Sequence, residues 1–142
     1  MRVKVLKNIL EANEAIASKN KELFNKHKIF SINFMSSPGA GKTSLILQTI
    51  RKLKDKIRIG VIEGDIASRI DANKIKEEAV NVVQINTGGG CSLDANMISQ
   101  AIDRLPLSKI DLLLIENVGN LICPAQFALG EHRRVIVSSL PE

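Results

Sequence analysis

The sequence contains no tryptophan or tyrosine and only four phenylalanines, which leaves aliphatic side chains to build the core. Hydrophobic residues make up 44% of the chain, and this fraction is large enough for a buried interior. A length of 142 residues suggests one domain. An aliphatic core of this kind suits a sheet that helices cover on both faces.

Long hydrophobic runs are also missing. No apolar stretch approaches the roughly 20 residues that a membrane-spanning helix needs, and the start of the chain, Met1-Arg2-Val3-Lys4-Val5, has no secretory apolar segment. We therefore expect a cytoplasmic protein with no membrane partner. In that reducing compartment we expect the only two cysteines, Cys91 and Cys123, to be thiols or metal ligands rather than a disulfide.

Positive charge exceeds negative charge, with 20 basic and 15 acidic residues and a net charge of +5. The basic residues concentrate before position 60, which is compatible with a nucleic-acid surface. However, most of these lysines lie opposite apolar helix positions, as on a solvated face, and no aromatic residues accompany them. We therefore expect no nucleic-acid partner.

Alternating apolar patterns predict an α/β fold. Residues 3–27 have the 3.6-residue period of an amphipathic helix that precedes the first strand. Strands are expected at 29–35, 57–62, 80–85, 111–115 and 134–140, with helices following Gly41 and at 66–79 and 93–104. This alternation gives a three-layer domain with a mostly parallel sheet and helices on both faces. We expect a single domain over 1–142, made of an N-terminal helix (1–27) and a nucleotide-binding core (29–142). Such sheets usually continue with another helix and strand, so the core is expected to lack its C-terminal part.

A Gly-rich turn, Ser36-Ser37-Pro38-Gly39-Ala40-Gly41-Lys42-Thr43, joins the first of these strands to the next helix. Strand, Gly-rich turn, Lys-Thr and helix form the phosphate-binding P-loop, although the strict motif has Gly where this chain has Ser36. The alternative is an ordinary turn before an amphipathic helix. We predict that residues 37–44, Ser37 to Ser44, bind a nucleotide. Lys42 would reach the outer phosphates and the Thr43 hydroxyl would hold Mg²⁺.

Two carboxylates are expected at the same sheet edge, where ligands of parallel sheets bind. Asp65 follows the second strand, and Glu116 follows the apolar run Asp111-Leu112-Leu113-Leu114-Ile115. Both are placed to hold Mg²⁺ directly or through water. The alternatives are a helix cap for Asp65 and a surface position for Glu116. Gly119 resembles the backbone γ-phosphate sensor of GTPases, so Lys42, Thr43 and Gly119 are the predicted catalytic groups.

Cys91 and Cys123 lie in loops that leave the same sheet edge. A lone buried cysteine is more often a small core residue, and this alternative stays open. Two thiolates cannot complete a four-coordinate site, but two subunits related by a two-fold axis would supply four sulfurs. Such a set suits tetrahedral Zn²⁺ or square-planar Ni²⁺. His27 and His132 are expected to be structural or solvent-facing.

Four segments together resemble the hydrogenase nickel-incorporation GTPase family, HypB, of the SIMIBI class: Met35 to Thr43, Glu63-Gly64-Asp65, Gly90-Cys91-x-Leu93-Asp94-Ala95, and Ile115 to Pro124. The resemblance implies a dimeric, metal-regulated P-loop GTPase that helps to load nickel into [NiFe] hydrogenase. It implies GTP and Mg²⁺ at Gly39 to Thr43, Asp65 and Glu116, and Ni²⁺ or Zn²⁺ at Cys91 and Cys123. The implied partners are a second copy of the chain, a nickel metallochaperone and the hydrogenase large subunit.

Three features depart from that family. Ser92 stands where a His usually follows the first metal cysteine, which removes an imidazole donor. The Cys-rich N-terminal nickel motif of some members is absent. The chain also ends before the expected Asn-Lys-x-Asp guanine-recognition segment, so a preference for GTP over ATP comes from the resemblance alone.

Three functions remain in competition at this stage. The first is GTP hydrolysis by positioning and charge stabilisation. The second is a nickel or zinc carrier that uses the nucleotide only as a dimerisation switch. The third is a truncated fragment without independent activity. An ATP-dependent P-loop kinase fits less well, because no second substrate pocket is visible and the Glu-Asn-Val-Gly run at 116–119 does not match it.

Overall fold

The computed structural model describes residues 2–64, 69–78 and 80–140. Along the chain its elements are α1 (Arg2–Lys26), β1 (Phe30–Ser36), α2 (Lys42–Leu53), β2 (Ile59–Glu63), α3 (Arg69–Glu77), β3 (Asn81–Gln84), α4 (Ala95–Ile102), the 3₁₀ turn η1 (Leu107–Lys109), β4 (Leu112–Glu116), α5 (Cys123–Gln126) and β5 (Arg133–Val137). Within these ranges no helix combines the length and the apolar character required to cross a bilayer.

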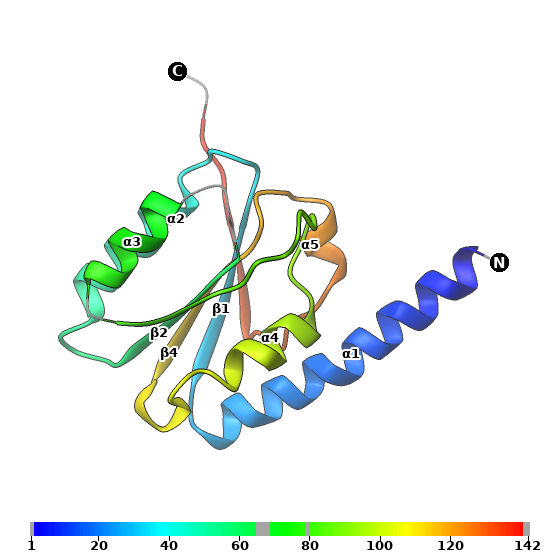
Figure 1. Cartoon of the computed structure of the whole chain (residues 1–142), viewed down its shortest axis with the longest axis horizontal. Helices are drawn as coiled ribbons and strands as arrows, with labels where there is room; N and C mark the ends of the chain where they lie inside the picture. The colour runs from blue at the N-terminus through cyan, green and yellow to red at the C-terminus, as the bar shows by residue number, and fades with distance from the viewer. Residues whose placement is uncertain (1, 65–68, 79, 141–142) are drawn as a thin grey trace.

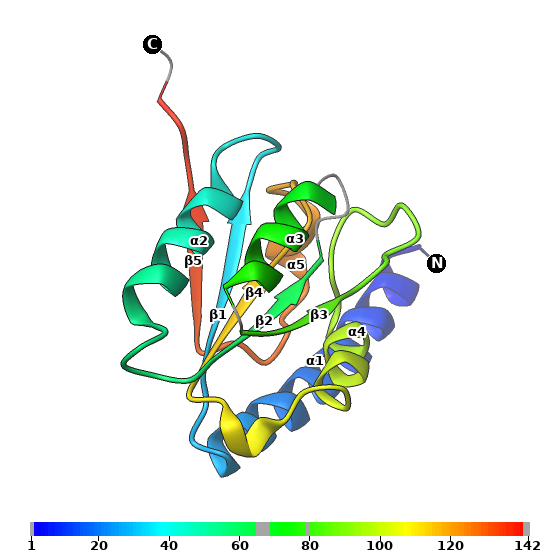
Figure 2. The same ribbon diagram turned by 60° about the vertical axis from the view of Figure 1, so that its left-hand side comes forward.

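The five strands form one sheet in the order β3-β2-β4-β1-β5, and each neighbouring pair is parallel (Figures 1 and 2). The predicted parallel α/β sheet is therefore confirmed. Because every strand runs in the same direction, all five carboxyl ends meet at one edge. The loops that leave this edge follow β1, β2, β3 and β4, and they carry the motifs singled out in the sequence.

Helices cover both faces of the sheet, as Figures 1 and 2 show: α2 and α3 lie on one face, and α1 and α4 lie side by side on the other. The side chains of β4 alternate between these layers. Leu113 and Ile115 belong to the core beneath α1 and α4, whereas Leu112 and Leu114 belong to the core beneath α2 and α3. A strand buried on both faces needs a continuous apolar run, which is what its sequence shows.

Two asparagines attach α1 to the body of the domain, a question that its amphipathic pattern alone left open. Asn13 accepts a hydrogen bond from the Ala95 backbone N–H at 2.8 Å and donates to the Ala128 carbonyl at 2.8 Å. Asn20 donates to the carbonyls of Ala95 and Leu129 at 2.9 and 3.0 Å. Both side chains are buried, so these bonds satisfy backbone groups that water cannot reach.

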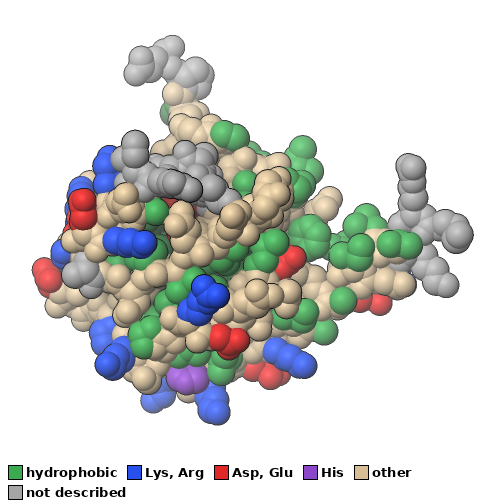
Figure 3. All heavy atoms as spheres, viewed as in Figure 1, with side chains coloured by type: hydrophobic (Ala, Val, Ile, Leu, Met, Phe, Trp, Pro, Cys, Tyr) green, Lys and Arg blue, Asp and Glu red, His purple; other side chains and the backbone are tan. Residues whose placement is uncertain are grey.

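The backbone of Gly130 also contacts α1 closely. Its φ is +97°, and a Cβ there would stand 2.6 Å from the Ala17 carbonyl oxygen and 2.7 Å from the Asn20 Cβ. Only glycine fits this approach. Beyond the docked part, α1 projects from the domain, and Val5, Leu6 and Ile9 are exposed along the hydrophobic stretch seen in Figure 3.

The C-terminus of α1 is closed by a Schellman motif. Lys28 takes the left-handed conformation at φ 57°, the Ile29 N–H donates to the Phe24 carbonyl at 2.9 Å, and the Lys28 N–H donates to the Asn25 carbonyl at 3.1 Å. Phe24 and Ile29 pack in the same core cluster. The motif turns the chain directly from the helix into β1.

Element boundaries differ from the sequence expectations in a few places. α4 begins at Ala95 rather than at Leu93, because the Asp94 side chain caps the helix by accepting from the Met97 N–H at 2.8 Å. β5 ends at Val137, three residues earlier than expected, and the short helix α5 was not expected. The helix expected at 66–79 appears as α3, while residues 66–68 and 79 lie outside the described part of the chain.

Candidate functional site

The turn between β1 and α2 has the backbone of an anion cradle. Gly39 and Gly41 have φ values of 75° and 95°, and no atom lies within 4 Å of the place where either Cβ would stand. α2 has no side-chain N-cap and no acidic residue in its first turn. The N–H groups at the start of this helix are therefore available to a negatively charged ligand, and the helix dipole favours one.

Lys42 and Thr43 extend from the first turn of α2 to the end of β4. The Thr43 hydroxyl donates to Glu116 Oε1 at 2.6 Å, and Lys42 Nζ lies 3.6 Å from the same oxygen. The side chains of Lys42 and Glu116 are 5% and 1% exposed, so this cluster is almost dry. A buried ion pair of this kind is weak evidence for stability and is better explained by function.

The donor set fits a magnesium ion. Glu116 Oε2 is buried and has no hydrogen-bond partner in the structure, which is costly for a carboxylate oxygen unless a cation or its water shell satisfies it. The Thr43 hydroxyl on the other oxygen completes the type of hard-oxygen set that Mg²⁺ takes beside phosphates. Thr43 and Glu116, two of the predicted magnesium ligands, thus lie in direct contact, whereas Asp65, the third, lies outside the described residues.

Glu63 is a further buried carboxylate that we did not single out from the sequence. It is the last residue of β2, it is 2% exposed, and it pairs in register with Glu116 on the neighbouring strand. The signal was present, since both residues are acids at the end of an apolar strand. We had assigned the role after β2 to Asp65, two positions later.

Gly119 lies directly against the P-loop. A Cβ on Gly119 would stand 3.2 Å from the Pro38 Cα atom, so the loop after β4 touches the phosphate-binding turn. Ser37 and Pro38 are exposed at the tip of that turn and Ser44 is exposed on α2, while Ala40 is half-buried. The structure thus brings the predicted P-loop residues and Gly119 to one place at the carboxyl edge.

The two cysteines also meet at this edge, because the loops leaving β3 and β4 converge there. Their Cα atoms are 6.0 Å apart, within disulfide range, and the structure joins Cys91 to Cys123 in a disulfide. The predicted approach of the two residues is confirmed, but the expectation of unbonded thiols is wrong for this structure. Neither side chain is buried, so neither is a core residue.

Ser92, which replaces the expected histidine, is buried, and its hydroxyl donates to the Leu93 carbonyl. It is therefore occupied within its own loop. Among residues 2–64, 69–78 and 80–140 no group of three or more His, Cys, Asp or Glu side chains has the arrangement of a metal site. A transition metal held by the cysteine pair would consequently need donors from outside the described residues.

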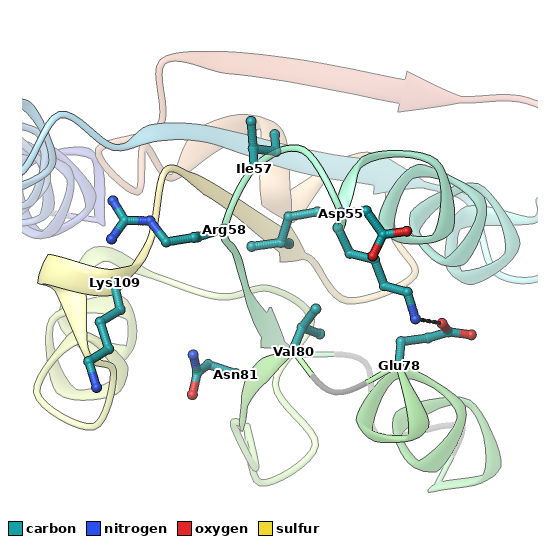
Figure 4. Close-up of a pocket in the computed structure, with 9 residues that line it drawn as sticks. Asp55, Ile57, Arg58, Glu78, Val80, Asn81 and Lys109 are labelled. Carbon is teal, nitrogen blue, oxygen red and sulfur yellow. Dashed lines mark hydrogen bonds and ion pairs between the residues drawn. The ribbon is translucent and has the colours of Figure 1, made fainter.

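A cavity of about 360 Å³ lies at the opposite, amino edge of the sheet (Figure 4). Hydrogen bonds from the Arg58 guanidinium lower the pKa of Asp111 beside it to about 2. On its other side Lys54 Nζ and Arg51 Nε donate to the Glu78 carboxylate at 2.8 and 2.7 Å. Most charged side chains around this cavity are therefore paired with each other. The P-loop and the other sequence motifs lie at the carboxyl edge instead.

Comparison with known proteins identifies relatives of the chain. HypB of Rhizobium leguminosarum bv. viciae, a hydrogenase maturation factor, is 49% identical over 140 residues, which are 99% of this chain and 47% of that protein. The chain thus spans about half the length of that curated relative.

Two solved structures share the fold. HypB from Archaeoglobus fulgidus superposes with a TM-score of 0.84 and 40% identity, over 90% of this chain and 62% of that one. HypB from Helicobacter pylori in complex with nickel superposes with a TM-score of 0.79 and 40% identity, over 88% of this chain and 59% of that one.

The family model of the CobW/HypB/UreG nucleotide-binding domain matches residues 31–138, from β1 to just beyond β5. The matched segment contains the P-loop, the buried carboxylates and both cysteines. The N-terminal resemblance to HypB relatives extends this match over α1, since the Rhizobium protein aligns with nearly the whole chain. The chain therefore belongs to the CobW/HypB/UreG family of nucleotide-binding domains, and its resemblance to HypB is confirmed.

Proposed function

We propose that this chain binds and hydrolyses GTP and that it uses the nucleotide to control nickel delivery to a [NiFe] hydrogenase. The observation that carries the proposal is the buried pair of Lys42 and Glu116, with the Thr43 hydroxyl bonded to Glu116, beside an open P-loop. Relatives named hydrogenase maturation factor supply the biological setting. We further propose a cytoplasmic homodimer whose partners are a nickel metallochaperone and the hydrogenase large subunit.

The P-loop residues would bind and orient the triphosphate. N–H groups of residues 39–43 bind phosphate oxygens, and the Lys42 ammonium, now 3.6 Å from Glu116 Oε1, turns to the outer phosphates. The Thr43 hydroxyl and Glu116, together with Asp65, would hold Mg²⁺, directly or through water. When bound, Mg²⁺ neutralises charge that develops on the β- and γ-phosphate oxygens.

The Gly119 N–H would contact the γ-phosphate, since this residue already packs against Pro38. Hydrolysis by this set depends on positioning and electrostatics rather than on a covalent intermediate. The carboxyl edge has no histidine to serve as a general base, because His27 and His132, the two histidines of the chain, precede β1 and β5 and so lie at the amino edge. We therefore expect slow intrinsic turnover.

Nickel would be the cargo, held by Cys91 and Cys123 in the reduced protein. The Cα atoms of the two cysteines are 6.0 Å apart, which is close enough for both sulfurs of the dithiol to bind one metal ion. Thiolates are good ligands for Ni²⁺ and for Zn²⁺. Formation of the disulfide and metal binding exclude each other, so the carrier form is the dithiol.

Substitution of Lys42 tests the nucleotide site. Lys42→Ala should weaken binding of a triphosphate with Mg²⁺ and reduce hydrolysis at least ~100-fold, the scale of losing one charge-stabilising group. Titration calorimetry and phosphate release measure the two effects, with GTP and ATP compared in parallel. Lys52→Ala, an exposed lysine of the same helix α2, is the matched control and should behave as the unmodified chain. Turnover retained by Lys42→Ala would refute the assignment.

A second function is favoured by the cysteine pair itself: a nickel or zinc carrier that uses the nucleotide only as a dimerisation switch. In that case GTP would promote dimer formation without being cleaved. Light scattering and phosphate release on the same sample separate the two functions. Dimerisation with no phosphate released favours the switch.

A further inference from the structure

Asn117, the residue after Glu116, makes an unusual number of internal hydrogen bonds. Its side chain is fully buried, and Oδ1 accepts from the backbone N–H groups of Leu93 at 3.0 Å and of Val118 at 2.9 Å. Its Nδ2 donates to Asn33 Oδ1 at 3.2 Å, and its own N–H donates to the Phe34 carbonyl at 3.0 Å. One side chain therefore links the end of β4 both to β1 and to the loop that contains Cys91.

Leu93, which donates to Asn117, also touches the loop after β2. Its side chain is fully buried, and a Cβ on Gly64 would stand 2.7 Å from both of its methyl carbons. The Gly64 N–H in turn donates to the Glu116 carbonyl at 2.8 Å. Leu93 is thus held between the two segments that directly follow the buried carboxylates Glu63 and Glu116.

The cysteines continue from the same two segments. Cys91 lies two residues before Leu93, and Cys123 lies in the segment that begins at Asn117. Within that segment Asn120 Oδ1 accepts from the N–H groups of Ile122 at 2.8 Å and of Cys123 at 3.3 Å. A displacement of residues 116–119 therefore reaches Cys123 along the chain, and it reaches Cys91 through the bond from Leu93 to Asn117.

We propose that Asn117 is a positioning residue that couples occupancy of the nucleotide site to the geometry of the Cys91–Cys123 pair. This inference rests on the proposed function and assigns its regulation to a named contact. In the buried interior no water can replace the hydrogen bond between the Leu93 N–H and Asn117 Oδ1, so breaking it would leave both groups unsatisfied. The two loops that this bond joins therefore move together. A nucleotide that shifts residues 116–119 thereby changes the separation of the two sulfurs.

Metal affinity measured with and without nucleotide tests this coupling. The reduced chain is titrated with Ni²⁺, once with Mg²⁺ and a non-hydrolysable GTP analogue and once without nucleotide. We expect the two dissociation constants to differ by about 5- to 150-fold, the usual range of coupling between two sites. In Asn117→Ala the difference should fall to about 2-fold or less.

Reciprocity separates coupling from simple structural damage. Ni²⁺ must change the affinity for the nucleotide by the same factor as the nucleotide changes the affinity for Ni²⁺. A variant that is only destabilised weakens both sites and keeps this factor. Asn20→Ala is the matched control, because it also removes a buried asparagine that bonds two backbone groups but touches neither Leu93 nor Asn117. It should keep the unmodified factor.

A milder pair of variants covers the case in which Asn117→Ala does not fold. Leu93→Val shortens the side chain that contacts Gly64, and Ile98→Val removes a methyl group from the same core cluster as a control. Only Leu93→Val should reduce the factor by which the nucleotide changes the affinity for Ni²⁺. A folded Asn117→Ala with the unmodified factor, or equal effects of the two milder variants, overturns the proposal. So does an unmodified chain that binds both ligands independently, a result that leaves the proposed function standing. A chain that binds no nucleotide overturns both the proposed function and this inference.

Discussion

The hydrogen-bond partners of His132 indicate the tautomer of its ring. Its Nδ1 accepts from the Ser31 N–H at 3.0 Å, and its Nε2 lies 2.7 Å from Asn25 Oδ1. The ring is therefore the neutral tautomer with the proton on Nε2, and it connects the start of β5 to β1 and to the end of α1. Burial lowers the pKa of His132, and the charges of Lys21 and Arg133 lower it further.

A lowered histidine pKa makes folding depend on pH in one direction. The unfolded chain binds the proton more tightly, with a pKa of about 6.5, so the stability that neutral His132 provides is present above that pH and is lost as the pH falls through it. We expect the free energy of unfolding to decrease between pH 7.5 and 5.5. In His132→Gln that decrease should be smaller, because the glutamine amide does not titrate in this pH range. Urea unfolding at both pH values measures it, and an equal decrease in both proteins would contradict the assignment.

At the scale of elements, the docking of α1 depends on the close approach of Gly130. Gly130→Ala should destabilise the domain by about 2–4 kcal/mol, because a Cβ would overlap backbone atoms of Ala17 in addition to the strain of a positive φ. Gly88→Ala is the control, since Gly88 has φ +63° but nothing within 4 Å of its Cβ position. It should lose only about 1–2 kcal/mol from the backbone conformation. Chemical denaturation compares the two, and equal losses would show that the contact with α1 is unimportant.

Individual elements also show what the sequence can and cannot predict. The run at 111–115 predicted a buried strand correctly, because a strand covered on both faces leaves no room for polar residues. Asn117 was invisible, since nothing in its local sequence shows that its amide will meet the Leu93 N–H, 24 positions away in the chain. The same holds for Asn13 and Asn20 on α1, whose hydrogen-bond partners Ala95, Ala128 and Leu129 lie far along the chain. Long-range partners of buried polar groups are set by tertiary packing, which a local pattern does not contain.

For the molecule as a whole, the predicted site residues that the structure describes lie at the carboxyl edge of the sheet. The rule that parallel strands end together was enough to place the P-loop, Glu116, Cys91 and Cys123 side by side. It was not enough to find Glu63 or to foresee the bond between the cysteines, because both depend on side-chain geometry within a few ångströms. At the charged amino edge, in contrast, Arg58 and Glu78 are held in ion pairs.

Metal stoichiometry is a prediction about the whole molecule. A single chain offers two thiolates, and the described residues add no third ligand that would complete a site. Titration of the reduced chain with Ni²⁺ should therefore saturate at about one metal per two chains, with light scattering showing about twice the chain mass. The double variant Cys91→Ser/Cys123→Ser should show neither effect. One metal per chain with the mass of a monomer would contradict the shared site.

The link between Cys91 and Cys123 has an effect even when the protein is not folded. The two residues are 32 positions apart, and the ring that they close contains α4 and β4 but not β2 or the P-loop. In a denatured chain the closed ring restricts backbone freedom. For a loop of this length the lost entropy stabilises the folded state by about 3–4 kcal/mol relative to the reduced chain. Oxidation and reduction of the two cysteines would then change the free energy of unfolding without altering any native contact outside the ring.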